Sequence, residues 1–313
     1  FSCSVLLVNH IIKLRLLCLS SVYSIDVSVM YTLRRPSMTT LWTNAVLKIR
    51  RSSDNATAFV FFDGSAIDDT ITLSSLISTA SNTTPDATTL TTWVGANDAF
   101  VEQWIGITAN NTIDANKTAI QATTASQPKI VTTGAINTKN GKPKFVFDGG
   151  NDFLKTTSAV SELASTNNFT VLSVSHHDVT AGRGIIFTTS DVDTSYYFLT
   201  NDRRTNKQHT VISNDPTVYQ ATLLAQQNSS NQKLLTTIHN ATNIISYYNS
   251  TIQQTTAHSG LSYTNTTLKI GAWGLSNNVL LNGSAQEITI FPSDKTTDLT
   301  TLDADINTYY SIY

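Results

Sequence analysis

The chain has 313 residues, of which 40% are hydrophobic and 13% are charged, and its formal net charge is −2. This hydrophobic share is sufficient for a buried core, and the length suits one large domain or two ordinary ones. Because lysine and arginine form no sustained basic stripe, the electrostatic footprint of a nucleic-acid-binding protein is missing, and we exclude nucleic acid as a partner.

The first 29 residues differ in composition from everything that follows them. They are rich in leucine, valine and isoleucine, contain no threonine, and hold both cysteines of the chain, Cys3 and Cys18. The rest of the chain therefore has no disulfide and no cysteine ligand for a metal. We predict an atypical N-terminal segment over residues 1–30 and one β-sandwich domain over residues 31–313.

Three interpretations of the N-terminal segment remain open. Lys13 and Arg15 before a short apolar run suggest a secretory signal, although no small-x-small cleavage site follows. A membrane-spanning helix needs about 20 unbroken apolar residues. Polar and charged side chains interrupt this run, so we predict no membrane span. The interpretation that we favour is upstream sequence translated in frame, with the start of the protein at Met30 or Met38.

The first part of the predicted domain alternates strands with less regular segments. Apolar and basic residues alternate over residues 44–50 as on a half-buried strand, and the apolar run at 59–62 predicts a second strand. The apolar spacing over 70–105 fits a helix or a strand, and we predict a helix-containing connection there. Residues 106–128 are polar and predict a long surface loop, after which Ile130-Val131 resumes β structure.

The most legible stretch runs from Asn140 to Leu154. Asn140-Gly141 tolerates positive φ angles and predicts a tight turn, and Phe145-Val146-Phe147 is a β-prone apolar run. The polar residues from Asp148 to Asp152 predict a second tight turn. We interpret the whole stretch as a β-hairpin signal.

Short β-prone runs between Asn, Asp, Gly and Ser continue to residue 292, which is the pattern of an all-β sandwich. Asp298 fits a helix N-cap, and the apolar residues from Leu299 to Tyr309 have helical spacing. We therefore predict an antiparallel β-sandwich with a short C-terminal helix. The nine strands predicted after the hairpin are Phe169–Val174, Gly184–Phe187, Tyr196–Leu199, Thr210–Ile212, Tyr219–Leu224, Leu234–Ile238, Asn243–Tyr248, Leu268–Ile270 and Gln286–Ile290.

Seven sequence blocks carry a family resemblance when they are taken together. They are Tyr31-Thr-Leu-Arg-Arg35, Ile49-Arg-Arg-Ser-Ser-Asp-Asn55, Gln127-Pro-Lys-Ile-Val131, Asn140-Gly-Lys-Pro143, Phe147-Asp-Gly149, Leu281-Asn-Gly-Ser-Ala-Gln-Glu-Ile288 and Ile306-Asn-Thr-Tyr-Tyr-Ser-Ile-Tyr313. The blocks resemble the concanavalin A-like modules related to the α-L-arabinofuranosidase B catalytic family. The later half is more similar to laminin-G-like lectin modules of bacterial surface proteins and phage structural proteins. The resemblance implies a jelly roll of two sheets.

Two departures from the arabinofuranosidase pattern argue against catalysis. Where those enzymes carry a Tyr-Asp-Gln-Ser-Gly segment, this chain has Gln103-Trp-Ile-Gly-Ile-Thr108 without the aspartate, and it lacks their paired cysteines at the sugar site. A retaining glycosidase needs two carboxylates about 5–5.5 Å apart. Glu287, in a predicted strand, is a weak catalytic candidate, and a solvated or hydrogen-bonded strand residue is the interpretation that we favour for it.

Calcium is left open as a cofactor, and no other cofactor is predicted. His176 and His177 are adjacent on a predicted strand and point to opposite faces, so they do not chelate one ion. Asp148, Asn151 and Asp152 offer the oxygen ligands that calcium prefers, but they follow no known loop pattern and are weak candidates.

Trp273, flanked by glycines, is the best candidate for contact with a sugar. The apolar C–H face of a pyranose stacks on an aromatic ring while amides and carboxylates bind its hydroxyls. Tyr196, Tyr197, Arg183 and Asp202 are the next candidates, because they lie on or near the predicted central strands. For each of the five, packing in the core or at its margin is the alternative.

The predicted function is a non-catalytic carbohydrate-binding or adhesion module of a cell-surface or virion (phage) surface protein, with an extracellular polysaccharide or surface glycan as its partner. A glycoside hydrolase of the arabinofuranosidase type is one alternative. A purely structural virion or filament subunit, with copies of itself or virion neighbours as partners, is another. An adhesin is expected to expose aromatic and amide groups at residues 106–128 and Trp273, whereas a structural subunit buries them against its neighbours.

Overall fold

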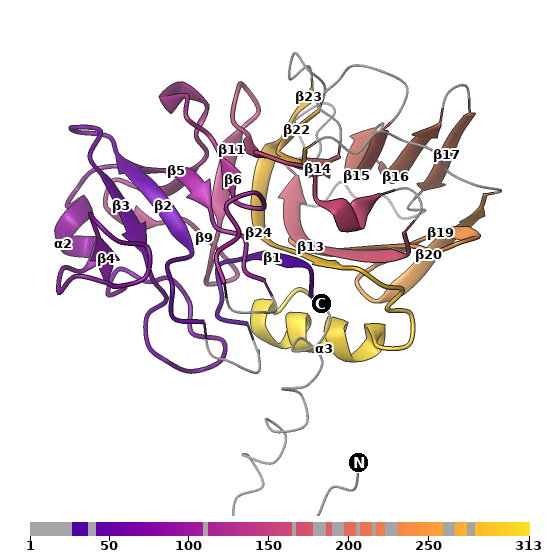
Figure 1. Cartoon of the computed structure of the whole chain (residues 1–313), viewed down its shortest axis with the longest axis horizontal. Coiled ribbons are helices and arrows are strands. Elements are labelled where there is room, and N and C mark those ends of the chain that lie inside the picture. The colour runs from indigo at the N-terminus through magenta and orange to yellow at the C-terminus, as the bar shows by residue number, and fades with distance from the viewer. Residues whose placement is uncertain are drawn as a thin grey trace, which may run out of the picture.

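The structure is a computed structural model of the chain (Figure 1). It describes residues 27–36, 42–108, 112–164, 167–177, 186–189, 197–204, 207–214, 217–222, 231–258, 267–273 and 279–313, with the backbone alone between 197 and 222. Regular structure in these ranges is almost entirely antiparallel β-strand, and the longest helix, α3 (Leu299–Tyr310), lies near the C-terminus. The fold is an all-β sandwich with a short C-terminal helix, as the sequence predicts.

The longest strand, β24 (Asn282–Phe291), is the centre of one layer. On one side it pairs with β13 (Phe169–His177) from Gly283 to Phe291. On its other side, its first half pairs with β11 (Phe145–Asp148) and its second half pairs with β1 (Val29–Thr32). Beyond β13, the layer continues through β18 (Lys233–His239), β19 (Asn243–Tyr248) and β20 (Thr251–Ala257).

Strand β5 (Ala99–Trp104) connects this layer to the second one. Its first residues pair with β7 (Lys129–Thr132), which also pairs with β11, and its last residues pair with β6 (Ala119–Ile120). From β6 the second layer continues in the order β12 (Leu154–Thr156), β21 (Lys269–Ile270), β14 (Phe187–Thr188), β15 (Tyr197–Arg204), β16 (Lys207–Asn214) and β17 (Thr217–Thr222).

The part of the chain between β1 and β5, indigo to purple in Figure 1, extends the sandwich sideways from β5. There β5 pairs with β2 (Leu47–Arg51), β2 with β3 (Thr57–Val60), and β3 with β4 (Ile77–Ser78). The short elements that complete the described chain are α2 (Leu90–Val94), β8 (Ala135–Ile136), β9 (Thr138–Lys139), β10 (Lys142–Pro143), β22 (Ala272–Trp273), β23 (Val279–Leu280) and two 3₁₀ turns, η1 (Thr124–Ser126) and η2 (Ser161–Leu163).

The core lies where both faces of the β24 layer are covered. Every residue of β13 except His176 is buried, and so is every residue of β24 from Ser284 onward, because α3 packs below these strands in Figure 1 while the second layer covers the opposite face. The buried residues of α3 include Leu299, Leu302 and Ile306, at the spacing of one helix face. The helix begins after Asp298 as predicted, but the Asp298 side chain makes no capping hydrogen bond.

The Asn140-Gly141 turn is confirmed. Both residues have positive φ angles, 50° and 73°, and β9 and β10 pair directly around them. The second part of the hairpin prediction is wrong, because β11 and β12 do not pair with each other. The turn Asp148–Asp152 instead carries the chain from the β24 layer to the second layer. A polar turn between two apolar runs has the same sequence pattern whether the chain returns to its own sheet or crosses to the facing one.

Two further predictions need correction. Residues 106–128 are not simply a surface loop, because they contain β6 and the buried side chains Gln121 and Gln127. These amides are polar but satisfied: Gln127 Nε2 donates to the Gln121 carbonyl at 2.8 Å, and Arg50 Nε donates to Gln127 Oε1 at 2.7 Å. Strand β20 is missing from the predicted strands, because its sequence, TIQQTTA, has one large apolar residue.

Each of the nine predicted strands overlaps an observed one.

The described chain begins before the boundary expected from composition. Val27 is buried, the Ser28 amide donates to the Ile290 carbonyl at 2.9 Å, and β1 starts at Val29. Residues 1–26 lie outside the described residues. The division into segments 1–30 and 31–313 stays a prediction.

Candidate functional site

Glu287, the candidate catalytic carboxylate, lies between β24 and α3 and is 1% exposed. Its Oε2 accepts hydrogen bonds from Arg34 Nε at 2.9 Å, from the Tyr310 hydroxyl at 3.1 Å and from the Thr32 hydroxyl at 3.2 Å. A sugar cannot reach a carboxylate that is enclosed and hydrogen-bonded in this way. The buried position of Glu287 is explained by its hydrogen bonds, which help to attach α3 to β24.

Arg34 is the centre of the same buried network. It is 1% exposed and forms ion pairs at 2.9 Å with Asp68, Glu287 and Asp305, which come from a loop, from β24 and from α3. Burial raises the pKa of Asp68, partly offset by the Arg34 charge. One cation thus connects three separate parts of the chain.

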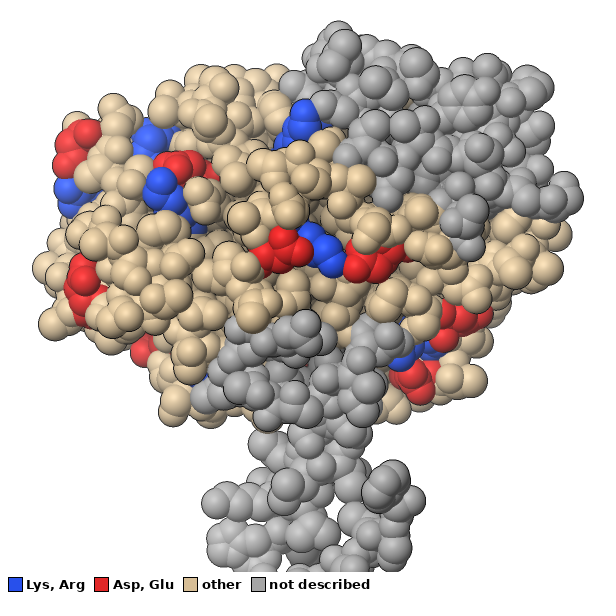
Figure 2. Space-filling view, in the orientation of Figure 1, with Lys and Arg blue, Asp and Glu red and all other residues tan. Residues whose placement is uncertain are grey.

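The other two glutamates are also in ion pairs. Glu102 Oε1 lies 2.6 Å from Lys48 Nζ, and Glu162 Oε1 lies 2.7 Å from Lys117 Nζ. Figure 2 shows that the face turned to the viewer is mostly uncharged, with acidic and basic side chains in small mixed groups. Charge on this face is therefore largely balanced locally.

Three stretches of chain meet at one edge of the sandwich, which we call the rim: the turn Asp148–Asp152, residues Gly271–Trp273 and residues Asn282–Gly283. Asp148 is opposite Asn282 in the β11–β24 pair. Gly271 has a φ of +88°, and a Cβ atom there would lie 2.6 Å from the Phe147 ring. The close approach and the left-handed backbone both require glycine. In Figure 1 the ends of β11, β22 and β23 are seen at the top centre.

The carboxylates of the rim turn bind mainly its own backbone. Asp148 Oδ1 accepts hydrogen bonds from the amides of Gly150 at 2.7 Å and Asn151 at 3.2 Å, and Asp152 Oδ2 accepts from the Asp148 amide at 3.0 Å. Within the described ranges, no three His, Cys, Asp or Glu side chains converge as a metal site would require. Calcium binding by Asp148, Asn151 and Asp152 stays a prediction.

Asp152→Asn is expected to stabilise the protein more at pH 8 than at pH 5. Burial, and then the Asp148 charge, raise the pKa of Asp152 to about 7, against a smaller lowering by the Asp148 amide and Lys129. Between pH 5 and about 7 the Asp152 carboxyl therefore keeps a proton in the folded protein that it has lost in the unfolded chain. The free energy of unfolding of the wild type consequently falls as the pH rises from 5 to 8.

We expect the stability difference between Asp152→Asn and wild type to grow by about 1 kcal/mol over this range, allowing for solvent screening at the rim. Urea denaturation of both proteins at pH 5 and pH 8 measures it. If the stability difference between the two proteins is the same at both pH values, the pKa of Asp152 is not raised in the folded protein.

Trp273, the best sugar-contact candidate, is half-buried at the end of β22, where it is paired with Val279 of β23. Two residues earlier, a Cβ atom at Gly271 would lie 3.4 Å from the Asp152 carbonyl oxygen. The structure thus brings Gly271, two residues before Trp273, next to the turn that contains the calcium candidates, although these are far apart in the sequence. Asn282, also half-buried, completes the rim; sequence analysis did not single it out, although it lies in one of the family-resemblance blocks.

The remaining candidates are placed only by the backbone or not at all. Arg183 and Tyr196 lie outside the described residues. Tyr197 and Asp202 are both on β15, where Tyr197 pairs with Ser213 and Asp202 with His209. They are five residues apart along the strand, which is about 16 Å. Sugar contact by these residues stays a prediction.

The two histidines lie where β13 ends beside the rim. His176 pairs with Ser284 and His177 with Gly283, and the His177 side chain is buried. As adjacent strand residues they point to opposite faces, as predicted.

None of the helices in the described ranges has the length and apolar composition needed to cross a bilayer.

The structure is similar to solved structures of two arabinofuranosidases and of one domain of an arabinanase. A glycoside hydrolase family 54 α-L-arabinofuranosidase soaked with a cyclic sulfate inhibitor matches with a TM-score of 0.57 and 11% identity over 92% of this chain and 63% of that one. An arabinofuranosidase complexed with arabinofuranosyl-α-1,2-xylobiose matches with a TM-score of 0.57 and 12% identity over the same shares. Domain 4 of an extracellular family 43 arabinanase from Geobacillus stearothermophilus, in complex with arabinotriose, matches with a TM-score of 0.45 and 15% identity over 54% of this chain and 80% of that chain.

No protein-family model matches the chain, and no curated protein matches it significantly. The chain spans 63% of the length of the two arabinofuranosidase structures, which is less than two thirds. At 11% and 12% identity, their likeness shows a shared β-sandwich fold and nothing about activity. The concanavalin A-like and laminin-G-like affiliations stay predictions.

Proposed function

We propose that this chain is a non-catalytic carbohydrate-binding module of a cell-surface or virion (phage) surface protein, and that it binds an extracellular polysaccharide at the rim. The observation that carries the proposal is the position of Trp273, half-buried at an edge where the exposed Asp148 and the half-buried Asn282 also lie. The β-sandwich fold shared with arabinofuranosidases is compatible with it.

The chemistry of the rim suits a neutral sugar. The accessible part of the Trp273 ring offers an apolar surface on which the C–H face of a pyranose or furanose stacks. The Asn282 amide can both donate and accept hydrogen bonds, and the Asp148 carboxylate accepts them from hydroxyls. A shallow edge with few polar groups binds weakly, so we expect micromolar to millimolar dissociation constants.

Trp273→Ala is expected to weaken glycan binding at least tenfold, because stacking on an indole contributes on the order of 1.4 kcal/mol or more. A glycan array followed by isothermal titration with any hit measures the effect. Ile252→Ala is the matched control: Ile252 is 54% exposed on β20, and its loss should leave affinity unchanged. Binding of no glycan by the wild type, or equal affinity of Trp273→Ala and wild type, would overturn the proposal.

A structural virion or filament subunit is the second candidate, and β20 is the observation that favours it. In the described part of the chain β20 pairs with β19 alone, and its sequence has no charge and no proline. Such an edge is open to pairing with another chain. Fibres or particles in electron micrographs of the purified protein, together with no glycan binding, would favour this candidate.

Glycoside hydrolysis is the third candidate and has the least support. All three glutamates are in ion pairs, and Glu287 is enclosed. Release of sugar from arabinan by the purified protein, abolished by Asp148→Asn, would favour this candidate instead.

A further inference from the structure

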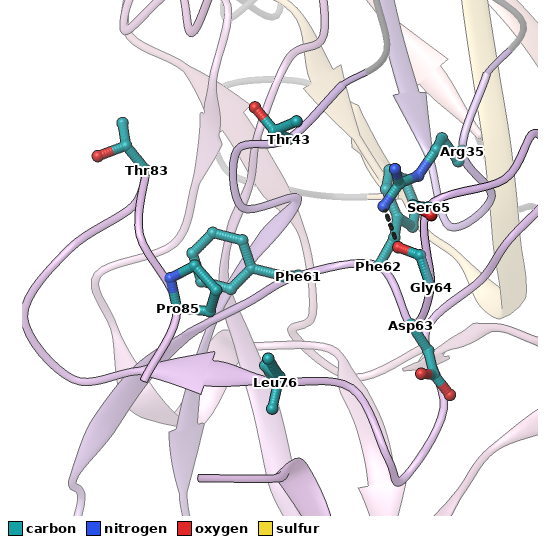
Figure 3. A pocket seen from close by; sticks show the side chains of 10 residues that line it. All are labelled: Arg35, Thr43, Phe61, Phe62, Asp63, Gly64, Ser65, Leu76, Thr83 and Pro85. Carbon is teal, nitrogen blue, oxygen red and sulfur yellow. Dashed lines mark hydrogen bonds between the residues drawn. The ribbon is translucent and has the colours of Figure 1, made fainter. Parts of the chain in front are cut away.

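A cavity of about 500 Å³ lies beside β3 and β4, in a part of the chain that does not contribute to the rim. Its volume is within the range of sites that hold a small ligand. Figure 3 shows the side chains that line it, among them Arg35, Thr43, Phe61, Phe62, Asp63 and Thr83.

The cavity has an apolar floor and hydroxyl-bearing walls. Phe61 and Phe62 are each 5% exposed, and in Figure 3 the Phe61 ring lies against Pro85. Thr43 and Thr83 are exposed at the margin. A sugar ring fits such a lining, because its C–H face covers an aromatic ring while hydroxyls bind its edge.

Arg35 is the unusual member of the lining. It is 5% exposed, Nη2 donates to the Gly64 carbonyl at 2.7 Å, and the guanidinium lies over the Phe62 ring at 5.4 Å. Among the described residues it has no ion pair, and its Nε is buried without a hydrogen-bond partner. Burial lowers its pKa, and Asp69 only partly offsets this. A buried arginine normally has an anionic partner.

Two acids in this part of the chain have hydrogen-bond partners other than Arg35. Asp63 accepts a hydrogen bond from the Thr72 hydroxyl, and Asp69 accepts one from the Ala66 amide. The neighbouring Arg34, by contrast, has three carboxylate partners. Arg34 thus belongs to the buried network, whereas Arg35 lines the cavity. Within the described chain Asp69 offsets the burial of Arg35 only in part, and no carboxylate forms an ion pair with it.

We propose that this cavity binds a carboxylate-bearing sugar, such as a hexuronic acid unit of an acidic polysaccharide, with its carboxylate on Arg35 and its ring against Phe61. The inference rests on the proposed function, because it supposes that the chain meets polysaccharides, and it adds a second subsite with a preference for charge. A bidentate contact between guanidinium and carboxylate is strong and directional, which makes arginine suited to this recognition.

The test is isothermal titration with a galacturonic acid oligosaccharide and with the same oligosaccharide after reduction of its carboxyl groups. We expect the acidic form to bind at least tenfold more tightly than the reduced form, and this preference to be lost in Arg35→Gln. Equal affinities for the two forms, or an unchanged preference in Arg35→Gln, would overturn the inference.

A second pair of variants covers the case in which Arg35→Gln does not fold. Thr83 is exposed on the cavity wall, so Thr83→Glu and its neutral match Thr83→Gln leave the core intact. Thr83→Glu is expected to weaken binding of the acidic oligosaccharide at least fivefold relative to Thr83→Gln and to leave the reduced form unaffected. If the two variants bind the acidic oligosaccharide with equal affinity, the cavity does not hold an anionic ligand.

Trp273→Ala separates this inference from the proposed function. If Trp273→Ala abolishes binding of neutral glycans but the wild type shows no acidic preference, the rim proposal stands and the cavity proposal falls. If acidic binding depends on Arg35 but neutral glycans do not bind at all, the cavity proposal stands and the rim proposal falls. If the wild type binds neither the acidic oligosaccharide nor any glycan of the array, both fall.

Discussion

Arg34→Met is expected to lower the free energy of unfolding by about 3–5 kcal/mol, because removal of one partner leaves the buried Glu287 carboxylate without its counter-charge. Arg34 is fully enclosed and holds Asp68, Glu287 and Asp305 at 2.9 Å each. Its loss also removes the contact of its guanidinium with the Tyr309 ring, at 5.4 Å. The connection of α3 to β24 and to the loop around Asp68 then depends on apolar packing and on the Tyr310 hydroxyl.

Urea denaturation at pH 7, followed by circular dichroism, measures this effect. Arg51→Met is the matched control, since Arg51 pairs at 2.6 Å with Asp54, whose side chain is largely exposed. An exposed pair of this kind contributes less than about 1 kcal/mol. If the two variants lose the same stability, the buried network does not attach the helix in the way that we describe.

Gly283→Ala is expected to be the second severe change. A Cβ atom at this position would lie 2.1 Å from the His176 carbonyl oxygen and 3.0 Å from the His177 Cα, and both are backbone atoms that cannot move independently of β13. Overpacking of this kind costs about 1–3 kcal/mol when side chains give way, and more when the backbone must shift. We expect a loss of at least about 3 kcal/mol, together with weaker glycan binding, because the rim contains Gly283.

Gly141→Ala is the control for this prediction. Gly141 has a φ of +73°, but no atom lies within 4 Å of where its Cβ would be. Its substitution therefore costs only the strain of a left-handed backbone, about 1–2 kcal/mol. If Gly283→Ala is no more destabilising than Gly141→Ala, the close approach of β13 to the start of β24 is wrong.

Much of the fold follows from local sequence patterns. The Asn140-Gly141 turn, the buried strand after Phe169 and the helix after Asp298 are each determined by residues close together in the chain, through backbone preferences and apolar spacing. The sequence predicts a hairpin at Asp148–Asp152, where the chain crosses between layers, because the choice of layer depends on partners far away, β24 for one strand and β21 for the other. Composition predicts a surface loop around Gln121 and Gln127, because it does not reveal that their amides are satisfied inside the protein.

The candidate site was only partly predictable for the same reason. Trp273 was selected for its chemistry, and Asp148 and Asp152 for their oxygen atoms, but their proximity results from the packing of Gly271 against Phe147. The role of Glu287 depends on Arg34, which is more than two hundred residues away in the sequence. Adjacent Arg34 and Arg35 look alike in the sequence, and only the structure separates the ion-pair network from the cavity.

The four tryptophans of the chain offer the most direct test of sugar binding at the rim. Trp42 and Trp104 are fully buried, Trp93 is 8% exposed, and Trp273 is half-buried. In an ¹H–¹⁵N spectrum their indole groups give separate signals, and the Trp273 signal is assigned by its absence from Trp273→Ala. On titration with a neutral oligosaccharide that binds, we expect the Trp273 signal to shift and the other three to stay in place. Saturable binding that leaves the Trp273 signal unmoved would contradict a glycan site at the rim.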